Sequence, residues 1–367
     1  MSMITTTQHQ VVVIGGGQAG LVTAALLAQA GTDYVVVDDQ RRVGESWARR
    51  WDSLRLVTPA RYATLPSFAS PWPPDYFPTK NEVARYLAVY AAHHQLRVRH
   101  SFRVEQLETD RAGAFIASGP AGVIVAAQVV VATGAYQKPW IPNAARGADP
   151  GLVQLHSDDY RTPAATPGGR VLVVGAGNSG VQIALELARA GREVHLACGG
   201  RLRSVRQVIA GRDLFWWMTR TAIMRASADG PIGRRLPTTD PVIGISESDL
   251  RSAGIVLRGR VSAVTGTKVT FADDSAWEPD TIVWATGYRP DDAWITIPGA
   301  LGADKALLHD EHRSRIPGLH VIGRPRQRTR GSSLLGFVTD DAQRMVRFLT
   351  SCPPRSTTAT STRRSES

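Results

Sequence analysis

Three glycines near the amino terminus have the spacing that a dinucleotide-binding turn requires. Gly15, Gly17 and Gly20 follow a β-branched run of strand type, and an apolar helical pattern follows them up to Gly31. In such a turn the first glycine makes the bend, the second lets a pyrophosphate approach the backbone, and the third lets helix and strand pack closely. Asp38 ends the next apolar run, where a carboxylate can accept hydrogen bonds from ribose hydroxyls. This segment therefore predicts a dinucleotide site.

The same pattern recurs 160 residues later, with Gly175, Gly177 and Gly180 in place of the first three glycines. Ten of the 28 positions are identical between residues 11–38 and 171–198. The period is too long for a solenoid, so we expect two separate dinucleotide-binding units.

The two copies differ where the second strand ends. The equivalent of Asp38 is Cys198, and Arg201 and Arg203 follow shortly after it. Loss of the carboxylate removes repulsion against a 2′-phosphate, and arginine side chains can pair with that group. The first site therefore suits FAD or NAD and the second suits NADPH. The alternative is that Cys198 and Arg201 are only packing and surface residues.

Two further segments, 129–139 and 282–290, each combine an apolar strand with Ala-Thr-Gly, as in Ala132, Thr133 and Gly134. Small residues there bring backbone close to a ligand. They bracket the second glycine turn, which predicts an α/β fold with two Rossmann-like domains, the NADPH domain inserted into the FAD domain. We expect an FAD-binding domain over 1–161 and 281–350, an NADPH-binding domain over 162–280, and a disordered tail over 351–367.

The length of 367 residues predicts one large or two ordinary globular domains, and the composition, 43% hydrophobic and 20% charged, is that of an ordinary globular protein. Its two cysteines, Cys198 and Cys352, exclude a disulfide framework and a dithiol pair, and no histidine spacing indicates a metal site. The net charge of +11 comes mostly from arginine, and we expect it to attract anionic cofactors rather than nucleic acid. No signal peptide or membrane-spanning run is expected, so the prediction is a cytoplasmic protein.

Two segments keep alternatives open. Residues 316–348 are expected to form a strand, a basic glycine-rich loop and a helix. Either the helix after Gly331-Ser332-Ser333 aims its amide end at a flavin ring or phosphate, or the arginines at 324, 326, 328 and 330 form a solvated surface loop. The aromatic segment 213–218 could line a substrate pocket, lie on a membrane surface, or form a helix that packs on the core. Packing is the favoured interpretation.

Together these motifs resemble the flavin-containing monooxygenases and related bacterial flavoproteins, including the plant auxin-forming monooxygenases, from Val11 to about Leu349. The resemblance implies that the first turn binds FAD and the second binds NADPH. It also implies that residues 51–59 run beneath the flavin and that the segment 76–80 precedes a helix. The expected cofactor-binding residues are Gly15, Gly17, Gln18, Ala19, Gly20, Asp38, Ser46, Trp47, Ala132, Thr133, Gly134, Gly175, Gly177, Asn178, Ser179, Gly180, Gln182 and Arg201.

The identifying motif of that family, Phe-x-Gly-x-x-x-His-x-x-x-Tyr, is met in part. His156 and Tyr160 keep their spacing, whereas the Phe is absent and Gly151 stands one place early. We expect His156 to bond backbone between the domains rather than to act as an acid or base. Val57 stands where animal-type members have an Asn near the reactive flavin carbon.

The resemblance implies an NADPH-consuming monooxygenase that inserts one oxygen of O₂ into a small molecule through a flavin C4a-hydroperoxide. Tyr160, which heteroatom-oxidising members share, favours a nitrogen or sulfur atom. Because the cofactors carry this chemistry, no catalytic side chain is assigned. The alternatives are Baeyer–Villiger oxidation of ketones, an NADPH-dependent flavin reductase or oxidase, and a cofactor-sensing binding protein without activity.

Overall fold

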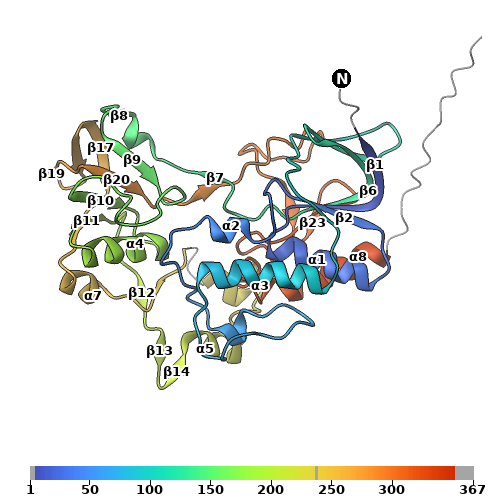
Figure 1. Ribbon diagram of the computed structural model, residues 1–367, viewed down its shortest axis with the longest axis horizontal. Coiled ribbons are helices and arrows are strands. Elements are labelled where there is room, and N and C mark those ends of the chain that lie inside the picture. Colours follow the sequence, from blue (N-terminus) through green and yellow to red (C-terminus); the bar gives the residue numbers. More distant parts are fainter. Residues whose placement is uncertain (1–4, 236–238, 352–367) are drawn as a thin grey trace, which may run out of the picture.

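Each copy of the glycine repeat folds into a strand, a helix and a second strand, and the copies lie in different lobes (Figure 1). The computed structural model describes residues 5–235 and 239–351, so the tail expected at 351–367 lies outside them except for Ser351. The first copy forms β1 (Thr6–Ile14), α1 (Gln18–Gln29) and β2 (Tyr34–Val37); the second forms β10 (Arg170–Val174), α4 (Asn178–Arg189) and β11 (Glu193–Ala197). The α/β class is confirmed.

The two lobes have parallel sheets with the same order of equivalent strands. That order is β3-β2-β1-β6-β24 in the first lobe and β16-β11-β10-β20-β9 in the second. The remaining parallel strands are β3 (Val98–Arg99), β6 (Gly122–Val131) and β24 (Leu319–Val321), and β9 (Val153–His156), β16 (Val256–Arg258) and β20 (Thr281–Trp284). The internal repeat therefore extends to whole sheets.

The side chains of β1 pack alternately on the two faces of the first sheet. Val11 and Val13 pack against three helices, and Val12 and Ile14 pack against the opposite layer, because successive strand side chains point to opposite faces. The helices are α1, α3 (Lys80–His93) and α8 (Val338–Ser351); the opposite layer contains β4 (Gln106–Thr109), β5 (Phe115–Gly119) and the segment 294–307. The antiparallel β22 (His309–Asp310) and β23 (Arg313–Ser314) extend the sheet beyond β24.

The second lobe is layered in the same way. Val171 and Val173 face α4 and α7 (Glu247–Ser252), whereas Leu172 and Val174 face a four-stranded sheet. That sheet consists of β8 (Gly147–Ala148), β17 (Val261–Gly266), β18 (Lys268–Phe271) and β19 (Ala276–Trp277), with the short helix η2 (Asn143–Arg146) beside it.

The chain crosses between the lobes at two short paired strands. β7 (Lys138–Pro139) and β21 (Tyr288–Arg289) run antiparallel between the lobes (Figure 1). The second lobe is thus inserted into the first, but it starts earlier and ends later than 162–280. β9 and β20 belong to it because they pair in parallel with each other and β20 pairs with β10. The crossings therefore differ from the expected boundaries at 161 and 281.

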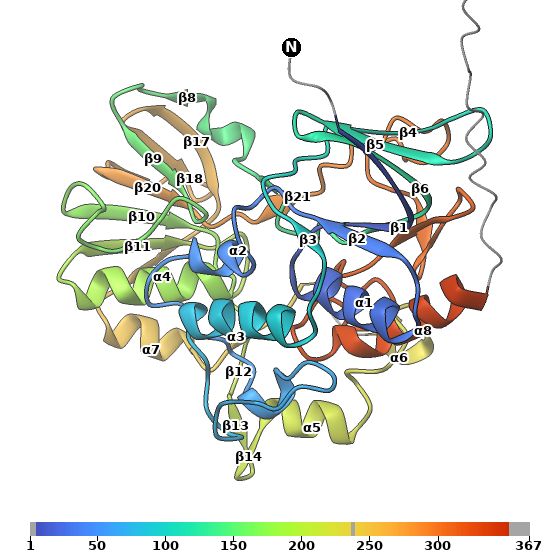
Figure 2. The same cartoon turned by 45° about the vertical axis from the view of Figure 1, so that its right-hand side comes forward.

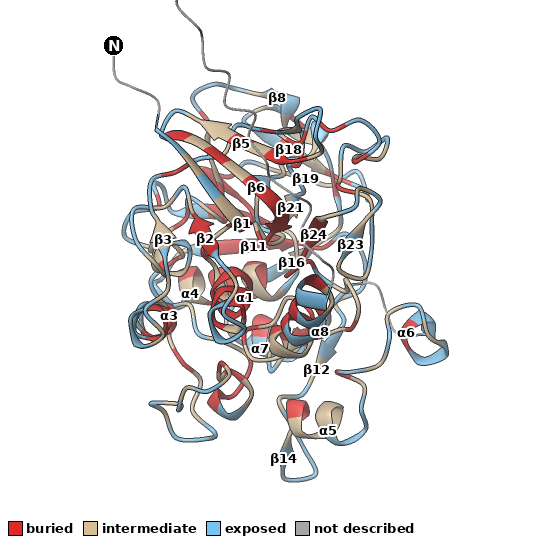
Figure 3. Cartoon of the chain, turned by 90° about the vertical axis from the view of Figure 1, so that its right-hand side faces the viewer, coloured by how far each residue is buried: buried red, intermediate tan, exposed pale blue. Residues whose placement is uncertain are grey.

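Residues 199–235 and 239–246 leave the second sheet and pack beneath the first lobe (Figure 2). They return through β15 (Val242–Ile243), which pairs with β12 (Ser204–Val205). The excursion contains the hairpin of β13 (Val208–Ile209) and β14 (Arg212–Asp213), and the helices α5 (Leu214–Arg220) and α6 (Pro231–Arg235). In Figure 3 the residues around β14 are mostly exposed, whereas the strands above them contain buried residues. None of the described helices has the length and apolar character to cross a membrane.

Candidate cofactor and active site

The first glycine turn closes against the strand that precedes Ala132. Gly15 has φ +113°, and a Cβ there would lie 2.6 Å from the Ala132 carbonyl oxygen, so no other residue fits. A Cβ at Gly20 would lie 1.9 Å from the Gly15 oxygen, because α1 passes close to the turn. A Cβ at Gly17 would meet nothing within 4 Å. The turn therefore leaves open space at the position where a pyrophosphate would approach.

A cavity of about 580 Å³ begins at this turn. It extends along Phe102 and Val104, past α2 (Glu45–Ala48), to the amino end of α4 in the other lobe. Of the expected residues it is lined by Gly15, Gly17, Gln18, Ala19, Asp38, Ser46, Trp47, Ala132, Thr133, Gly134, Asn178, Ser179 and Gln182. Gly20, Gly175, Gly177, Gly180 and Arg201 do not line it.

Asp38 is held by two backbone donors. Its Oδ2 accepts the N–H of Gly16, and its Oδ1 accepts the N–H of Gln40 at 2.7 Å. Burial raises the pKa of the Asp38 carboxyl, and these two donors oppose that shift. A Cβ at Gly16 would lie 2.8 Å from Asp38 Oδ2, so a glycine at position 16 leaves this carboxylate uncrowded.

Gln18 joins three parts of the cavity wall. Its Nε2 donates to the carbonyl of Ser333 at 3.2 Å, and its Oε1 accepts from Trp47 Nε1 at 3.4 Å. The expected helix after Gly331 begins only at Val338; the residues between form turns, and Ser333 itself lines the cavity. The helix amide end is therefore not at the position that the sequence predicted.

The segment that the resemblance placed beneath the flavin is fixed by a buried lysine. Lys80, 4% exposed, donates from Nζ to the Ala48 carbonyl at 3.0 Å and to Asp52 Oδ1 at 2.7 Å. It is the first residue of α3, so the expected helix begins at the last residue of the segment 76–80 rather than after it, and Thr79 caps that helix. Trp51 lines the cavity, and its buried Nε1 has no hydrogen-bond partner among the described residues. This orphaned donor and the open space at Gly17 fit a large polar cofactor such as FAD.

Val57 also lines the cavity, and its carbonyl accepts from Gln207 Nε2 at 3.2 Å. Arg55 is exposed and lines the cavity as well, and its Nη1 donates to the Phe77 carbonyl at 3.1 Å. Thr58 is buried, 7% exposed. Val57 therefore gives this part of the wall an apolar side chain, with the bonded Arg55 guanidinium at the same cavity.

A polar cluster that the sequence did not predict lies where the chain crosses between lobes. Arg50 Nη1 pairs with Asp158 Oδ1 at 2.6 Å and also bonds the Tyr288 hydroxyl. Its guanidinium lies 5.3 Å from the centre of the Tyr136 ring. Burial raises the pKa of Tyr288 to about 12, so this phenol stays protonated and donates to Asp158 at 2.9 Å. The sequence indicated this cluster only in that Asp158 follows β9 and Tyr288 follows β20, two strands that pair in parallel.

His156 and Tyr160, the two residues of the partial family motif, both bond to other parts of the protein. His156 Nδ1 accepts the N–H of Asp158 at 3.1 Å, so its Nε2 carries the proton and donates to the Gly287 carbonyl at 3.0 Å. The expected backbone role of His156 is thus seen. Tyr160 is fully buried in the second lobe and donates to Glu186 at 3.0 Å. Because Tyr160 does not line the cavity, it carries no argument about which atom is oxidised.

The second glycine turn repeats the first in geometry. A Cβ at Gly175 would lie 2.3 Å from the Ala285 oxygen, one at Gly180 would lie 1.8 Å from the Gly175 oxygen, and one at Gly177 would meet nothing within 4 Å. Asn178 uses its side chain within the chain, since its Oδ1 accepts the Ile243 N–H at 3.0 Å. The second turn thus also leaves space for a pyrophosphate.

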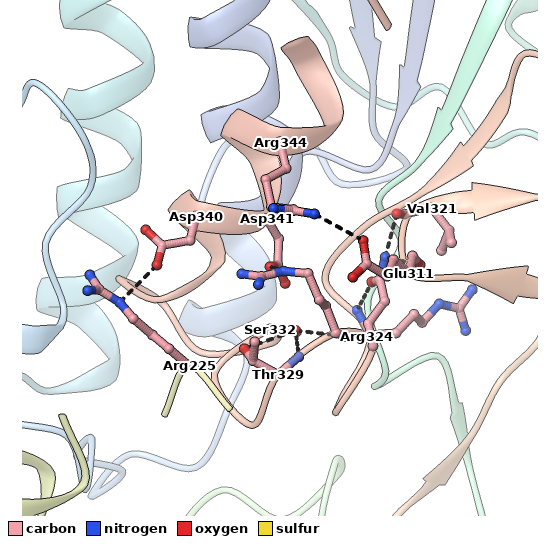
Figure 4. A network of polar contacts seen from close by, with 11 residues as sticks. Arg225, Glu311, Val321, Arg324, Thr329, Ser332, Asp340, Asp341 and Arg344 are labelled. Atoms are coloured by element: carbon pink, nitrogen blue, oxygen red, sulfur yellow. Dashed lines mark hydrogen bonds and ion pairs between the residues drawn. The ribbon is translucent and has the colours of Figure 1, made fainter. Parts of the chain in front are cut away.

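The arginine loop from 324 to 330 is not the solvated surface loop that the sequence left open as an alternative. Its side chains bond acids or carbonyls of distant segments: Arg324 with Asp292 at 2.6 Å, Arg330 with Asp240 at 2.6 Å, Arg328 with Asp341, and Arg326 with the Gly233 carbonyl at 3.2 Å. Figure 4 shows the neighbouring pairs Arg225–Asp340 and Arg344–Glu311. The loop therefore ties the first lobe together and holds the excursion of the second.

The aromatic segment 213–218 packs on the first lobe. Phe215 is 2% exposed, and its ring lies 6.3 Å from that of Tyr62 in the short helix η1 (Ala60–Tyr62). None of these residues lines the cavity. The favoured packing interpretation agrees with these contacts.

Comparison with known proteins gives concordant matches. The model of the family described as pyridine nucleotide-disulphide oxidoreductase matches residues 12–209. An oxidoreductase of Geobacillus kaustophilus named CzcO-like is 36% identical over 92% of this chain and 98% of its own. The indole-3-pyruvate monooxygenase YUCCA1 of Oryza sativa is 29% identical over 85% and 86%. The solved flavin-containing monooxygenase from Stenotrophomonas maltophilia superposes with a TM-score of 0.79 at 25% identity, over 94% of this chain and 98% of its own.

Proposed function

This chain belongs to the pyridine nucleotide-disulphide oxidoreductase family, and on that basis we propose that it is an FAD-dependent monooxygenase that consumes NADPH and oxidises a nitrogen or sulfur atom of a small molecule. The protein is an oxidoreductase with FAD and NADPH as its cofactors. Its sequence relatives and structural neighbours, monooxygenases among them, support a flavin-dependent monooxygenase. The identity of the oxidised atom and the roles of the cavity residues are our proposal.

One observation carries the proposal: a single cavity is lined both by the first glycine turn and by the amino end of α4 in the other lobe. Gly17 and Asp38 would hold the pyrophosphate and ribose of FAD, and Ser179 and Gln182 would contact the nicotinamide coenzyme in the same space. Bound FAD supplies hydride acceptance and reaction with O₂. Hydride transfer needs both cofactors in one cavity, and binding alone does not.

The residues of the cavity would orient the cofactors and limit water. Trp51 offers its unpartnered Nε1 as a donor, and Val57 presents an apolar wall. The charge of Arg50 is compensated by Asp158 at 2.6 Å, and Arg55, which also lines the cavity, donates to the Phe77 carbonyl at 3.1 Å. An apolar wall disfavours an anionic oxygen and favours a neutral, electrophilic one, which oxidises nitrogen and sulfur rather than carbonyl carbon.

Product analysis tests this choice. We expect purified holoenzyme, NADPH and ¹⁸O₂ to label the products of a sulfide and amine panel, and to give little lactone or ester from a cyclic ketone panel. NADPH consumed and H₂O₂ released are measured in parallel. H₂O₂ equal to NADPH with every substrate would indicate an oxidase, and labelled lactones without N- or S-oxides would indicate ketone oxidation; either result contradicts the proposal.

Coenzyme choice gives a second test. Cys198 is 8% exposed, and Ala176 stands where the first copy has Gly16. Because a Cβ opposite Asp38 would crowd its carboxylate, we expect Cys198→Asp alone to bring a carboxylate against the Ala176 methyl group. We therefore expect Cys198→Asp/Ala176→Gly, rather than Cys198→Asp, to shift kcat/KM from NADPH toward NADH, by about tenfold or more for one lost phosphate bond. Ala176→Gly alone is the control. Equal efficiency of the wild type with both coenzymes would contradict this assignment.

A further inference from the structure

The internal repeat locates the adenosine end of the second dinucleotide site. β3 lies beside β2 as β16 lies beside β11. Asp38 donates its N–H to the Arg99 carbonyl at 3.0 Å, and Cys198 donates its N–H to the Arg258 carbonyl at 3.0 Å. Arg99 and Arg258 are therefore equivalent positions, each at the end of the strand that neighbours the ribose-binding position.

The residues just beyond β3 line the first cavity: Phe102, Arg103 and Val104 lie there with Asp38. By the equivalence, the residues just beyond Arg258 border the second dinucleotide site. Arg260 stands two places beyond Arg258. Its counterpart in the first copy, Ser101, does not line the cavity itself but directly precedes the lining residue Phe102. The carboxyl ends of neighbouring parallel strands share one edge of a sheet, and in such folds this edge binds the ribose and any 2′-phosphate.

The guanidinium of Arg260 already lies across this edge. Its Nη2 donates to the carbonyl of Gly199, the residue after Cys198, at 3.3 Å. The side chain is exposed, and within residues 5–235 and 239–351 it has no carboxylate partner. Burial and the nearby charge of Glu247 raise the pKa of the Cys198 thiol. The Glu247 carboxylate is itself paired with Arg251 at 2.8 Å.

We propose that Arg260 binds the 2′-phosphate of NADPH and sets the coenzyme preference of the enzyme. The inference rests on the proposed function, and it adds a residue that comes from a different strand than the glycine turn. A guanidinium fits a phosphate because its N–H donors match two oxygens at once. Arg201 is also exposed, and no hydrogen bond or ion pair fixes it among the described residues. Arg260 differs from Arg201 in that its Nη2 already bonds the Gly199 carbonyl at this edge, which lowers the side-chain entropy lost on binding.

Equilibrium binding to the FAD-loaded protein tests the proposal without turnover. The ligands are NADP⁺, NAD⁺, and the fragments 2′,5′-ADP and 5′-AMP, measured by calorimetry. Arg260→Ala should weaken NADP⁺ and 2′,5′-ADP about tenfold or more and leave NAD⁺ and 5′-AMP within about twofold. Arg260→Lys should retain part of the affinity. The matched control is Arg189→Ala, which removes one exposed charge from the last turn of α4, at the opposite edge of the same sheet.

The other outcomes separate the inference from the proposed function. Equal weakening of NADP⁺ and NAD⁺ would mean that Arg260 contacts the shared part of the coenzyme, which overturns the inference. Unchanged binding in Arg260→Ala, with loss in Arg201→Ala, would assign the phosphate to Arg201 and also overturn it. A wild type that holds FAD but binds neither coenzyme would overturn the proposed function. The flavin spectrum of each variant reports an intact first lobe.

Discussion

Gly17→Val should give a folded, colourless protein, whereas Gly177→Val should give a yellow protein that no longer binds NADPH. Both glycines have extended backbone, with φ −76° and −81°, and a Cβ at either would meet nothing within 4 Å. The folded chain can therefore accept a side chain at both positions. The valine would occupy the space of the pyrophosphate and block its bonds to the backbone amides. Losing two such bonds would weaken binding by about 100-fold or more.

The measurements are flavin content by absorbance, NADP⁺ affinity by calorimetry, and fold by circular dichroism. Gly169→Val is the control, since Gly169 also has open space around its Cβ position but lies outside the cavity. Gly20→Val should fail to fold instead, because its Cβ would lie 1.9 Å from the Gly15 oxygen. A Gly17→Val protein that retains stoichiometric FAD would show that the first turn does not bind the cofactor.

Asp292→Ala is expected to cause the largest loss of stability. Asp292 is 1% exposed; its Oδ1 lies 2.6 Å from Arg324 Nη2, and its Oδ2 accepts the Leu307 N–H at 2.9 Å. Removing this carboxylate would leave the Arg324 charge buried without a partner. Breaking a buried pair in this way costs about 3–5 kcal/mol.

Urea unfolding measures the loss of stability, and the control removes the acid that pairs with a second arginine of the same loop. Asp240→Ala breaks the pair with Arg330, but the Asp240 side chain is 70% exposed, so the expected cost is below about 1 kcal/mol. The double variant Asp292→Leu/Arg324→Met should be more stable than Asp292→Ala, since it leaves no unpaired charge. Similar losses for Asp292→Ala and Asp240→Ala would refute the assignment of a critical buried pair.

Sequence alone was sufficient where the determinants are local. The glycine turns and their helices lie within about 30 residues, and the spacing of Gly15, Gly17 and Gly20 specifies one backbone path. The offset of 160 residues places α1 and α4 in equivalent positions, as both begin one residue after the second glycine. The α/β class and the two-unit architecture followed from these segments and are confirmed by the fold.

Tertiary structure decided every feature that depends on contacts between distant segments. β20 pairs with β10 across more than 100 residues, so the crossings between lobes could not be placed by composition or motif. Arg324 and Arg330 pair with acids 32 and 90 residues away in the sequence, and Tyr160 is buried in the core of the second lobe. Arg260 reaches Gly199 only because β16 lies beside β11. Local patterns fix turns and helices, whereas strand order and burial fix the partners of each side chain.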